Sequence, residues 1–112
     1  LHDLKTVAEY DIPVKIFILN DNCLSMVRAW EKLYYDGRYV ATTLRGNPNY
    51  RRVARAYGIP SLRCEKKSLL DDNVEMALQQ KGPVLVEFAV ESDVCFPLVG
   101  PGKALDDMLT HT

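Results

Sequence analysis

The segment of residues 14–26 reads VKIFILNDNCLSM and carries the clearest indication of the fold. Residues 14–19 are almost continuously apolar and rich in β-branched and aromatic side chains, which predicts a strand of a parallel sheet covered on both faces. Asn20, Asp21 and Asn22 should end this strand, because such side chains bond their own backbone and favour turns. A helix over about residues 24–34 is expected next. The order of strand, polar turn and helix is typical of α/β proteins.

Helical patterns occur on both sides of this segment. Apolar residues at Leu4, Val7 and Ala8 predict a helix at the start, and because no capping residue precedes it, we expect the chain to begin inside that helix, as an excised piece would. Further along, Asn47 is expected to cap a helix whose first residue is Pro48. Its buried face should hold Tyr50, Val53, Ala54 and Tyr57, and it should end at a left-handed Gly58.

The second half of the chain continues the alternation. A short strand over residues 61–65 precedes a helix that Ser68 and Asp71 should open as a capping box and that should run to about residue 80. Its inward residues are expected to be Leu70, Val74, Ala77 and Leu78. Residues 84–90 form the strongest strand pattern, in which Glu87 should face a sheet edge or pair with an Arg or Lys. A final helix is expected over residues 103–109.

These elements predict an α/β fold, a parallel sheet with flanking helices and right-handed crossovers. Only three strands are recognisable, over residues 14–19, 61–65 and 84–90. Both edges of such a sheet stay unpaired, so the missing strands should come from upstream sequence or from another chain. We therefore expect this piece to self-associate when isolated.

Composition excludes several classes of function. The 112 residues are 47% hydrophobic and 26% charged, with a formal net charge of −1, as in a soluble single domain without general attraction for nucleic acid or a membrane surface. Cys23, Cys64 and Cys95 are widely spaced, which predicts reduced thiols in the cytoplasm and no zinc site, with Cys95 a packed thiol rather than a nucleophile. His2 and His111 lie at opposite ends, so neighbouring histidines cannot form a metal cluster or triad.

The polar junction after the first strand is the best place for chemistry. In open parallel sheets, ligands bind beyond the carboxyl ends of the strands. Residues 20–26 offer carboxylate, amide and carbonyl oxygens, which suit a hard divalent cation, and a helix N-terminus that favours phosphate. A diphosphate bridged to Mg²⁺ would use both features. The alternative is that these residues form a turn and nothing more.

Three stretches resemble a known family: VAEYDIPVKIFILNDNCLSMVRAWEKLYYDGRY at residues 7–39, NPNYRRVARAYGIPSLR at residues 47–63, and KGPVLVEFAVESDVCFPLVGPGKALDDML at residues 81–109. The most specific patterns are the spacing of Met26, Val27 and Trp30, the run over residues 35–39, and the tail over residues 96–103. Together they resemble the C-terminal thiamine-diphosphate-binding domain of acetolactate synthase (acetohydroxyacid synthase) large subunits. The resemblance implies part of a Rossmann-like three-layer domain over residues 1–112, because the Gly-Asp-Gly half of the thiamine-diphosphate motif is absent.

The resemblance also implies roles for individual residues. Asn20 and Asp21 match the pair that closes the motif, so Asp21 would be a Mg²⁺ ligand. Cys23 matches the position whose backbone carbonyl binds the metal. Residues 24–26, namely Leu24, Ser25 and Met26, match the segment that lies against the diphosphate and thiazolium. Met26 and Trp30 would line the substrate pocket.

For function, the resemblance implies a parent enzyme that condenses pyruvate with a second 2-keto acid in branched-chain amino acid biosynthesis. Its cofactors would be thiamine diphosphate and Mg²⁺, with FAD in the parent enzyme. The glutamate that activates the cofactor belongs to another domain, so this chain should hold no catalytic residue and be inactive alone. Expected partners are the remainder of the large subunit, a homodimer or tetramer, and a possible regulatory small subunit, all in the cytoplasm.

Three positions depart from the family pattern. Asp21 replaces Asn and adds a negative charge near a diphosphate. Ser25 replaces Gly, which would cost about 1 kcal/mol if the position requires a positive φ. Ala29 replaces Gln. Two alternatives stay open. One is a related 2-keto acid decarboxylase or oxidase, against which Trp30 argues, and the other is a non-catalytic module, which the absent Gly-Asp-Gly half and the changes at Asp21 and Ser25 favour. Met26 and Trp30 could also be ordinary packing residues.

Overall fold

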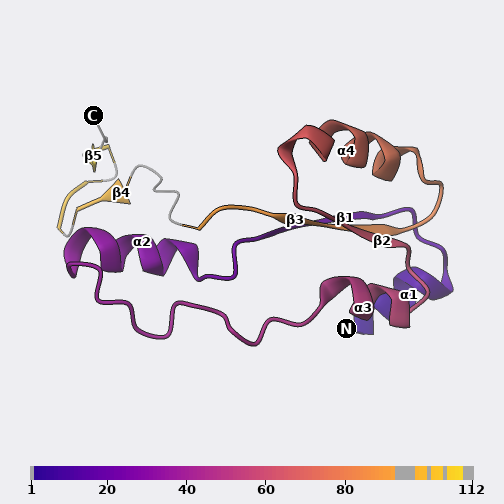
Figure 1. The fold of residues 1–112 in the computed structure, drawn as a ribbon, viewed down its shortest axis with the longest axis horizontal. Coiled ribbons are helices and arrows are strands. Elements are labelled where there is room, and N and C mark those ends of the chain that lie inside the picture. Colours follow the sequence, from indigo (N-terminus) through magenta and orange to yellow (C-terminus); the bar gives the residue numbers. More distant parts are fainter. Residues whose placement is uncertain (1, 93–97, 101, 105, 110–112) are drawn as a thin grey trace. The chain divides into compact units, whose positions relative to one another are not determined.

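A computed structural model describes residues 2–92, 98–100, 102–104 and 106–109 (Figure 1). The chain forms two compact units. Unit 1 comprises residues 1–22 and 45–90, and unit 2 comprises residues 23–44 and 91–112. Among the residues described, none of the helices is long and apolar enough to span a bilayer.

Unit 1 is built on the predicted parallel sheet. Strands β1 (Lys15–Asn20), β2 (Ser61–Cys64) and β3 (Val84–Ala89) lie in the order β1-β3-β2 and are all parallel. Helices α1 (His2–Glu9) and α3 (Tyr50–Ala56) cover one face, and α4 (Leu70–Gln79), which follows the 3-10 turn η1 (Lys67–Leu69), covers the other (Figure 1). The predicted α/β class and its three parallel strands are confirmed.

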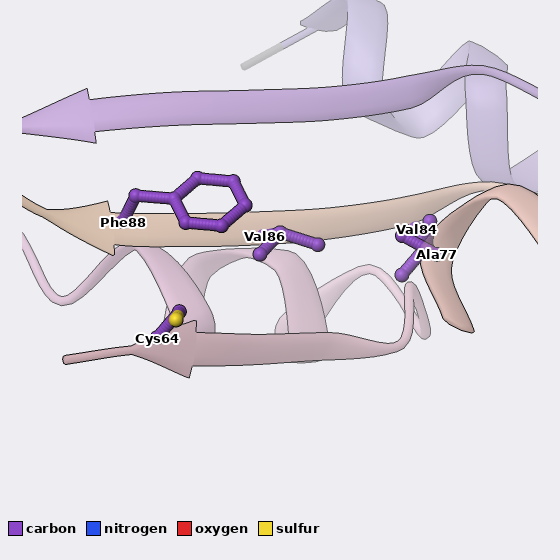
Figure 2. Close-up of a cluster of buried hydrophobic side chains, with 5 residues drawn as sticks. All are labelled: Cys64, Ala77, Val84, Val86 and Phe88. Atoms are coloured by element: carbon purple, nitrogen blue, oxygen red, sulfur yellow. The ribbon is translucent and has the colours of Figure 1, made fainter. Parts of the chain in front are cut away.

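The central strand β3 explains where the core lies. Its side chains alternate between the two faces, as in any strand. Val84, Val86 and Phe88 pack with Cys64 of β2 and Ala77 of α4 (Figure 2). On the opposite face, Leu85 packs with Ala54 and Ile59, beside apolar residues of α1 and β1. Of the β3 residues, only Ala89 is exposed, as expected of a strand covered on both sides.

The edge strand β1 is covered less well. Ile16 and Ile18 pack on the face that α1 and α3 cover. On the α4 face, Phe17 touches Phe88 with ring centroids 5.9 Å apart, yet it stays 42% exposed, and Leu19 is 73% exposed. The expectation of two covered faces therefore holds for β3 but is wrong for β1. Self-association through this edge stays a prediction.

The start of α3 differs from the prediction. Asn49, not Asn47, caps the helix, and its side chain accepts a hydrogen bond from the Arg52 N–H at 3.0 Å. The physical reason is that the Asn47 amide bonds residues of the β1 turn instead. The predicted end is confirmed, because Gly58 has a φ of +75°.

Helix α4 also begins differently. Ser68 lies inside η1, and the N-cap is Leu69 without a side-chain bond, so the predicted capping box is wrong. Val74 and Ala77 face inward as expected, but Leu70 and Leu78 are 40% and 60% exposed. Because α4 packs mainly on one strand, β3, only the side chains nearest that strand are covered.

Unit 2 contains α2 (Ser25–Tyr34), as predicted, followed by a long loop. Instead of the predicted final helix, β4 (Leu98–Val99) and β5 (Met108–Leu109) form an antiparallel pair. The reason is that the backbone of β5 finds a strand partner in β4, a pairing that the helical pattern of residues 103–109 alone cannot reveal. Among the described residues Cys23 and Cys64 form no disulfide, whereas Cys95 lies outside the described residues.

Candidate cofactor-binding site

The candidate site begins where β1 ends. Asn20 is the last residue of β1 and pairs with Ala89 of β3, and its carbonyl accepts a hydrogen bond from the Val90 N–H at 3.1 Å. The carboxyl ends of two neighbouring parallel strands therefore meet at this turn. Such an edge is where α/β sheets bind their ligands.

The Asn20 side chain is held at both of its ends. Its Oδ1 accepts hydrogen bonds from the Asn22 N–H at 3.0 Å and from Asn47 Nδ2 at 3.2 Å. Its Nδ2 donates to Glu87 Oε1 at 2.8 Å. These contacts fix the orientation of the amide. In this structure Asn20 shapes the turn through its side chain.

The sharp bend of the turn falls at Asn22. This residue has a φ of +58°, a left-handed conformation that asparagine adopts more readily than most residues. Asn47 Nδ2 also donates to Asn22 Oδ1 at 3.3 Å, so one amide braces both asparagines of the turn. Ser25 is instead the first residue of α2 and is absent from the positive-φ residues, so the strain considered there is not found.

Asp21, which lies between the two asparagines in the sequence, supplies the carboxylate of the turn and is partly buried. Oxygen donors of this kind suit Mg²⁺. Within the described part of the chain, however, no three His, Cys, Asp or Glu side chains gather into a metal site. The donor chemistry therefore fits a magnesium ion, while most of its ligands would have to be backbone oxygens, cofactor phosphates, water or groups from other sequence.

The remaining predicted residues belong to unit 2. Cys23 forms an isolated antiparallel bridge with Thr43, and the Leu24 N–H donates to the Thr42 carbonyl at 2.8 Å. Leu24 is also the N-cap of α2 and makes no side-chain capping bond. These backbone contacts fix the entry to α2 without using the Cys23 thiol.

The predicted pocket residues are exposed on α2. Met26 is 52% exposed and Trp30 is 50% exposed, whereas their neighbour Ala29 is buried. Ordinary core packing within this chain therefore does not explain either residue. The structure places both residues on the same helix.

Sequence reasoning missed a second feature of unit 2. The Glu31 carboxylate accepts hydrogen bonds from the Val40 N–H and the Thr42 hydroxyl, both at 2.8 Å, and Thr42 is 1% exposed. An open hollow of about 640 Å³ lies beside these Glu31 hydrogen bonds. It is lined by Val27, Glu31, Tyr35, Arg38 and Val40. The distinctive run over residues 35–39 was the only signal in the sequence that could have indicated it.

Glu87, Arg63 and Asn47 were also missed as parts of the site. Arg63 NH1 lies 3.1 Å from Glu87 Oε1, so the acid that bonds Asn20 is also ion-paired. The prediction that Glu87 pairs with a basic residue is confirmed. The alternative that it faces an edge is wrong, because β3 is the central strand. An acid inside an apolar strand was the signal, but its partners lie far away in the sequence.

The fold and the turn define an α/β unit whose candidate ligand-binding edge lies at the carboxyl ends of its strands. The family model described as "Thiamine pyrophosphate enzyme, C-terminal TPP binding domain" matches residues 1–88. The chain therefore belongs to this family. This membership confirms the expected fold and the relation to thiamine-diphosphate enzymes.

Individual relatives narrow the similarity. The chain is 37% identical over 111 residues to an acetolactate synthase of Arthrospira platensis, covering 97% of this chain and 19% of that protein. It is 43% identical over 110 residues to the mitochondrial acetolactate synthase of Schizosaccharomyces pombe, covering 97% of this chain and 16% of that protein. The chain thus spans about a fifth or less of these relatives.

A solved structure is similar as well. The thiamine diphosphate-dependent 4-hydroxybenzoylformate decarboxylase of Rhodococcus jostii RHA1 aligns with a TM-score of 0.70 and 26% identity. The alignment covers 80% of this chain and 17% of that one. The fold of most of this chain is therefore shared with a thiamine diphosphate-dependent decarboxylase.

Proposed function

We propose that this chain is the cofactor-binding segment of an acetolactate synthase, holding the diphosphate of thiamine diphosphate through Mg²⁺. The observation that carries the proposal is the oxygen-rich turn at the carboxyl end of β1, in a chain whose residues 1–88 match a thiamine-diphosphate-binding domain. The parent reaction would join pyruvate to a second 2-keto acid. Acetolactate synthases among the relatives support this choice of reaction.

Each predicted residue then has a role. The Asp21 carboxylate and the Cys23 carbonyl would hold Mg²⁺, and Asn20 would keep the turn in shape. The backbone of residues 24–26 would contact the diphosphate, because the N-terminal end of α2 favours negative charge. When bound, thiamine diphosphate supplies the electron sink that the decarboxylation of a 2-keto acid requires. Met26 and Trp30 contribute apolar surface that excludes water from the substrate.

Other parts of the parent supply the rest of the activity. This chain spans 19% of the Arthrospira platensis relative, so the activating glutamate, the FAD site and the contacts of a dimer or tetramer are assigned to sequence beyond residues 1–112. This assignment is why we expect the chain to bind cofactor weakly and to be inactive alone. A regulatory subunit would bind those other regions as well.

A second candidate is a decarboxylase of the same superfamily, because the similar solved structure is one. The two candidates differ in what accepts the two-carbon unit, a second 2-keto acid or a proton. Trp30 favours the synthase, since a large exposed aromatic residue can hold the second acid. An assay of the full-length parent with pyruvate separates them: acetolactate supports the synthase, and acetaldehyde alone supports the decarboxylase.

The direct test is calorimetric titration of thiamine diphosphate with Mg²⁺ into this chain, repeated with EDTA. We expect binding that disappears with EDTA and with Asp21→Ala. The matched control is Asp72→Asn, an exposed acid on α4 far along the chain, which should leave the affinity unchanged. A folded chain that shows no metal-dependent binding contradicts the proposal and favours a non-catalytic module.

A further inference from the structure

A line of polar side chains crosses the three strands of an otherwise apolar sheet. Asn20 ends β1, Glu87 lies in β3, and Arg63 lies in β2, directly opposite Glu87 in the strand register. The Glu87 Oε1 atom accepts from both neighbours, at 2.8 Å from Asn20 Nδ2 and 3.1 Å from Arg63 NH1. One buried carboxylate oxygen thus joins the turn at residues 20–22, hereafter the cofactor turn, to β2 at the far edge of the sheet.

The burial of Glu87 is unfavourable for the free energy of folding. Glu87 is 3% exposed, and the β3 residues on both sides of it are buried and apolar. Removing a carboxylate from water is costly, and an apolar pair of similar size often stabilises a core equally well or better. The position therefore calls for a reason beyond stability.

Arg63 contacts two carboxylates, the exposed one of Glu65 and the buried one of Glu87. Arg63 Nε lies 2.8 Å from the exposed Glu65 carboxylate, but within the described residues this buried nitrogen has no hydrogen bond of acceptable geometry. The bond from Arg63 NH1 to Glu87 does satisfy that geometry. Arg63 thus balances the charge of Glu87, and Glu87 remains able to accept from Asn20.

We propose that Glu87 is a positioning residue of the cofactor turn, which rests on the proposed function. By accepting from Asn20 Nδ2, it turns Asn20 Oδ1 toward the Asn22 N–H and Asn47. This orientation holds the left-handed bend at Asn22 and so fixes the backbone on both sides of Asp21. Glu87 itself does not touch the cofactor.

The competing explanation is that the ion pair only clamps β2 to β3. The two explanations differ in which property of Glu87 matters. A clamp needs the negative charge opposite Arg63. A positioning residue needs a hydrogen-bond acceptor within reach of Asn20, which glutamine keeps and methionine lacks.

The experiment compares variants for both folding and cofactor binding. Glu87→Gln, Glu87→Met and the control Glu65→Gln are titrated with thiamine diphosphate at fixed Mg²⁺, and their Tm is measured without cofactor. Glu87→Met should weaken cofactor binding about tenfold, as the loss of an outer partner of a metal site typically does. Glu87→Gln should stay within about threefold, because its amide oxygen still accepts from Asn20. Glu65→Gln should leave the affinity unchanged.

A double variant separates binding from folding where Glu87→Met alone fails to fold. Glu87→Met with Arg63→Met replaces the pair by apolar side chains, which keeps the sheet folded because no charge is left unpaired. We expect it to retain a cooperative thermal transition and to bind cofactor about tenfold more weakly than the wild type. A folded double variant that binds as well as the wild type overturns the proposal, as does equal weakening by Gln and Met.

The outcome for the wild-type chain keeps the two proposals distinguishable. If the folded wild type shows no metal-dependent binding, the proposed function fails, and the role of Glu87 fails with it. If the wild type binds and Glu87→Met binds equally well, only the positioning role fails. Nuclear magnetic resonance gives a second readout, because the Asn20 side-chain amide signals should shift in Glu87→Met and stay near their wild-type position in Glu65→Gln.

Discussion

Replacing Asn22 by alanine and by glycine tests how the cofactor turn is held. Asn22 has a φ of +58°, and its side chain accepts one exposed hydrogen bond from Asn47 at 3.3 Å. In this conformation a Cβ without a compensating polar group costs about 1 kcal/mol. The lost bond adds roughly 0.5 kcal/mol, the low end for a net hydrogen bond. Asn22→Ala should therefore lower the free energy of unfolding by about 1.5 kcal/mol.

Asn22→Gly loses the same hydrogen bond, but glycine still tolerates the positive φ at this position. Its greater freedom in the unfolded chain offsets part of that benefit, so the net loss should be roughly 0.5 to 1 kcal/mol. Urea denaturation followed by circular dichroism measures both changes, and the slope of each transition should stay unchanged. If the alanine variant proves at least as stable as the glycine variant, the left-handed bend at residue 22 is not what the turn requires, and the reasoning is refuted.

Three further predictions test other parts of the structure. Gly58→Ala should cost about 1 kcal/mol, because φ is +75° there, while Gly46→Ala, equally open but without positive φ, should be neutral or slightly stabilising by thermal denaturation. Val86→Ala, at a fully buried position of the central strand, should cost about 2 to 3 kcal/mol in urea. Glu31→Ala removes the acceptor of the Val40 N–H, so hydrogen exchange at that amide should accelerate about tenfold or more. Unchanged exchange would contradict the hydrogen bond between Val40 and Glu31.

Local patterns were sufficient for most of the sheet. The apolar runs at β1 and β3 and the glycine at residue 58 each encode their structure in a few neighbouring residues. Where the prediction failed, the structure depends on contacts with residues outside the local pattern. Asn47 and Asn49 are equally good caps by themselves, and only the contacts of Asn47 with the β1 turn assign the cap to Asn49. The pairing of β4 with β5 is likewise absent from any local pattern.

The candidate site likewise contains residues that local sequence could predict and residues that it could not. Asn20 and Asp21 could be predicted because the turn after β1 is polar and carries a family motif. Glu87 could be noticed as an acid in an apolar strand, but its role depends on strand order and register. Only the observation that β3 lies between β1 and β2 brings Glu87 within reach of both Asn20 and Arg63.

The order of strands has a consequence for how this chain folds during synthesis. The strand that comes last, β3, is the only partner of β1 and of β2 in the described sheet, and its first residue pairs with Lys15. Neither edge strand can complete its backbone hydrogen bonds until the ribosome has released residues 84–89. Because such distant pairings slow folding, the apolar β1 segment stays without its β3 partner after it leaves the ribosome. Chaperones would have the greatest effect on the yield of folded chain during that interval.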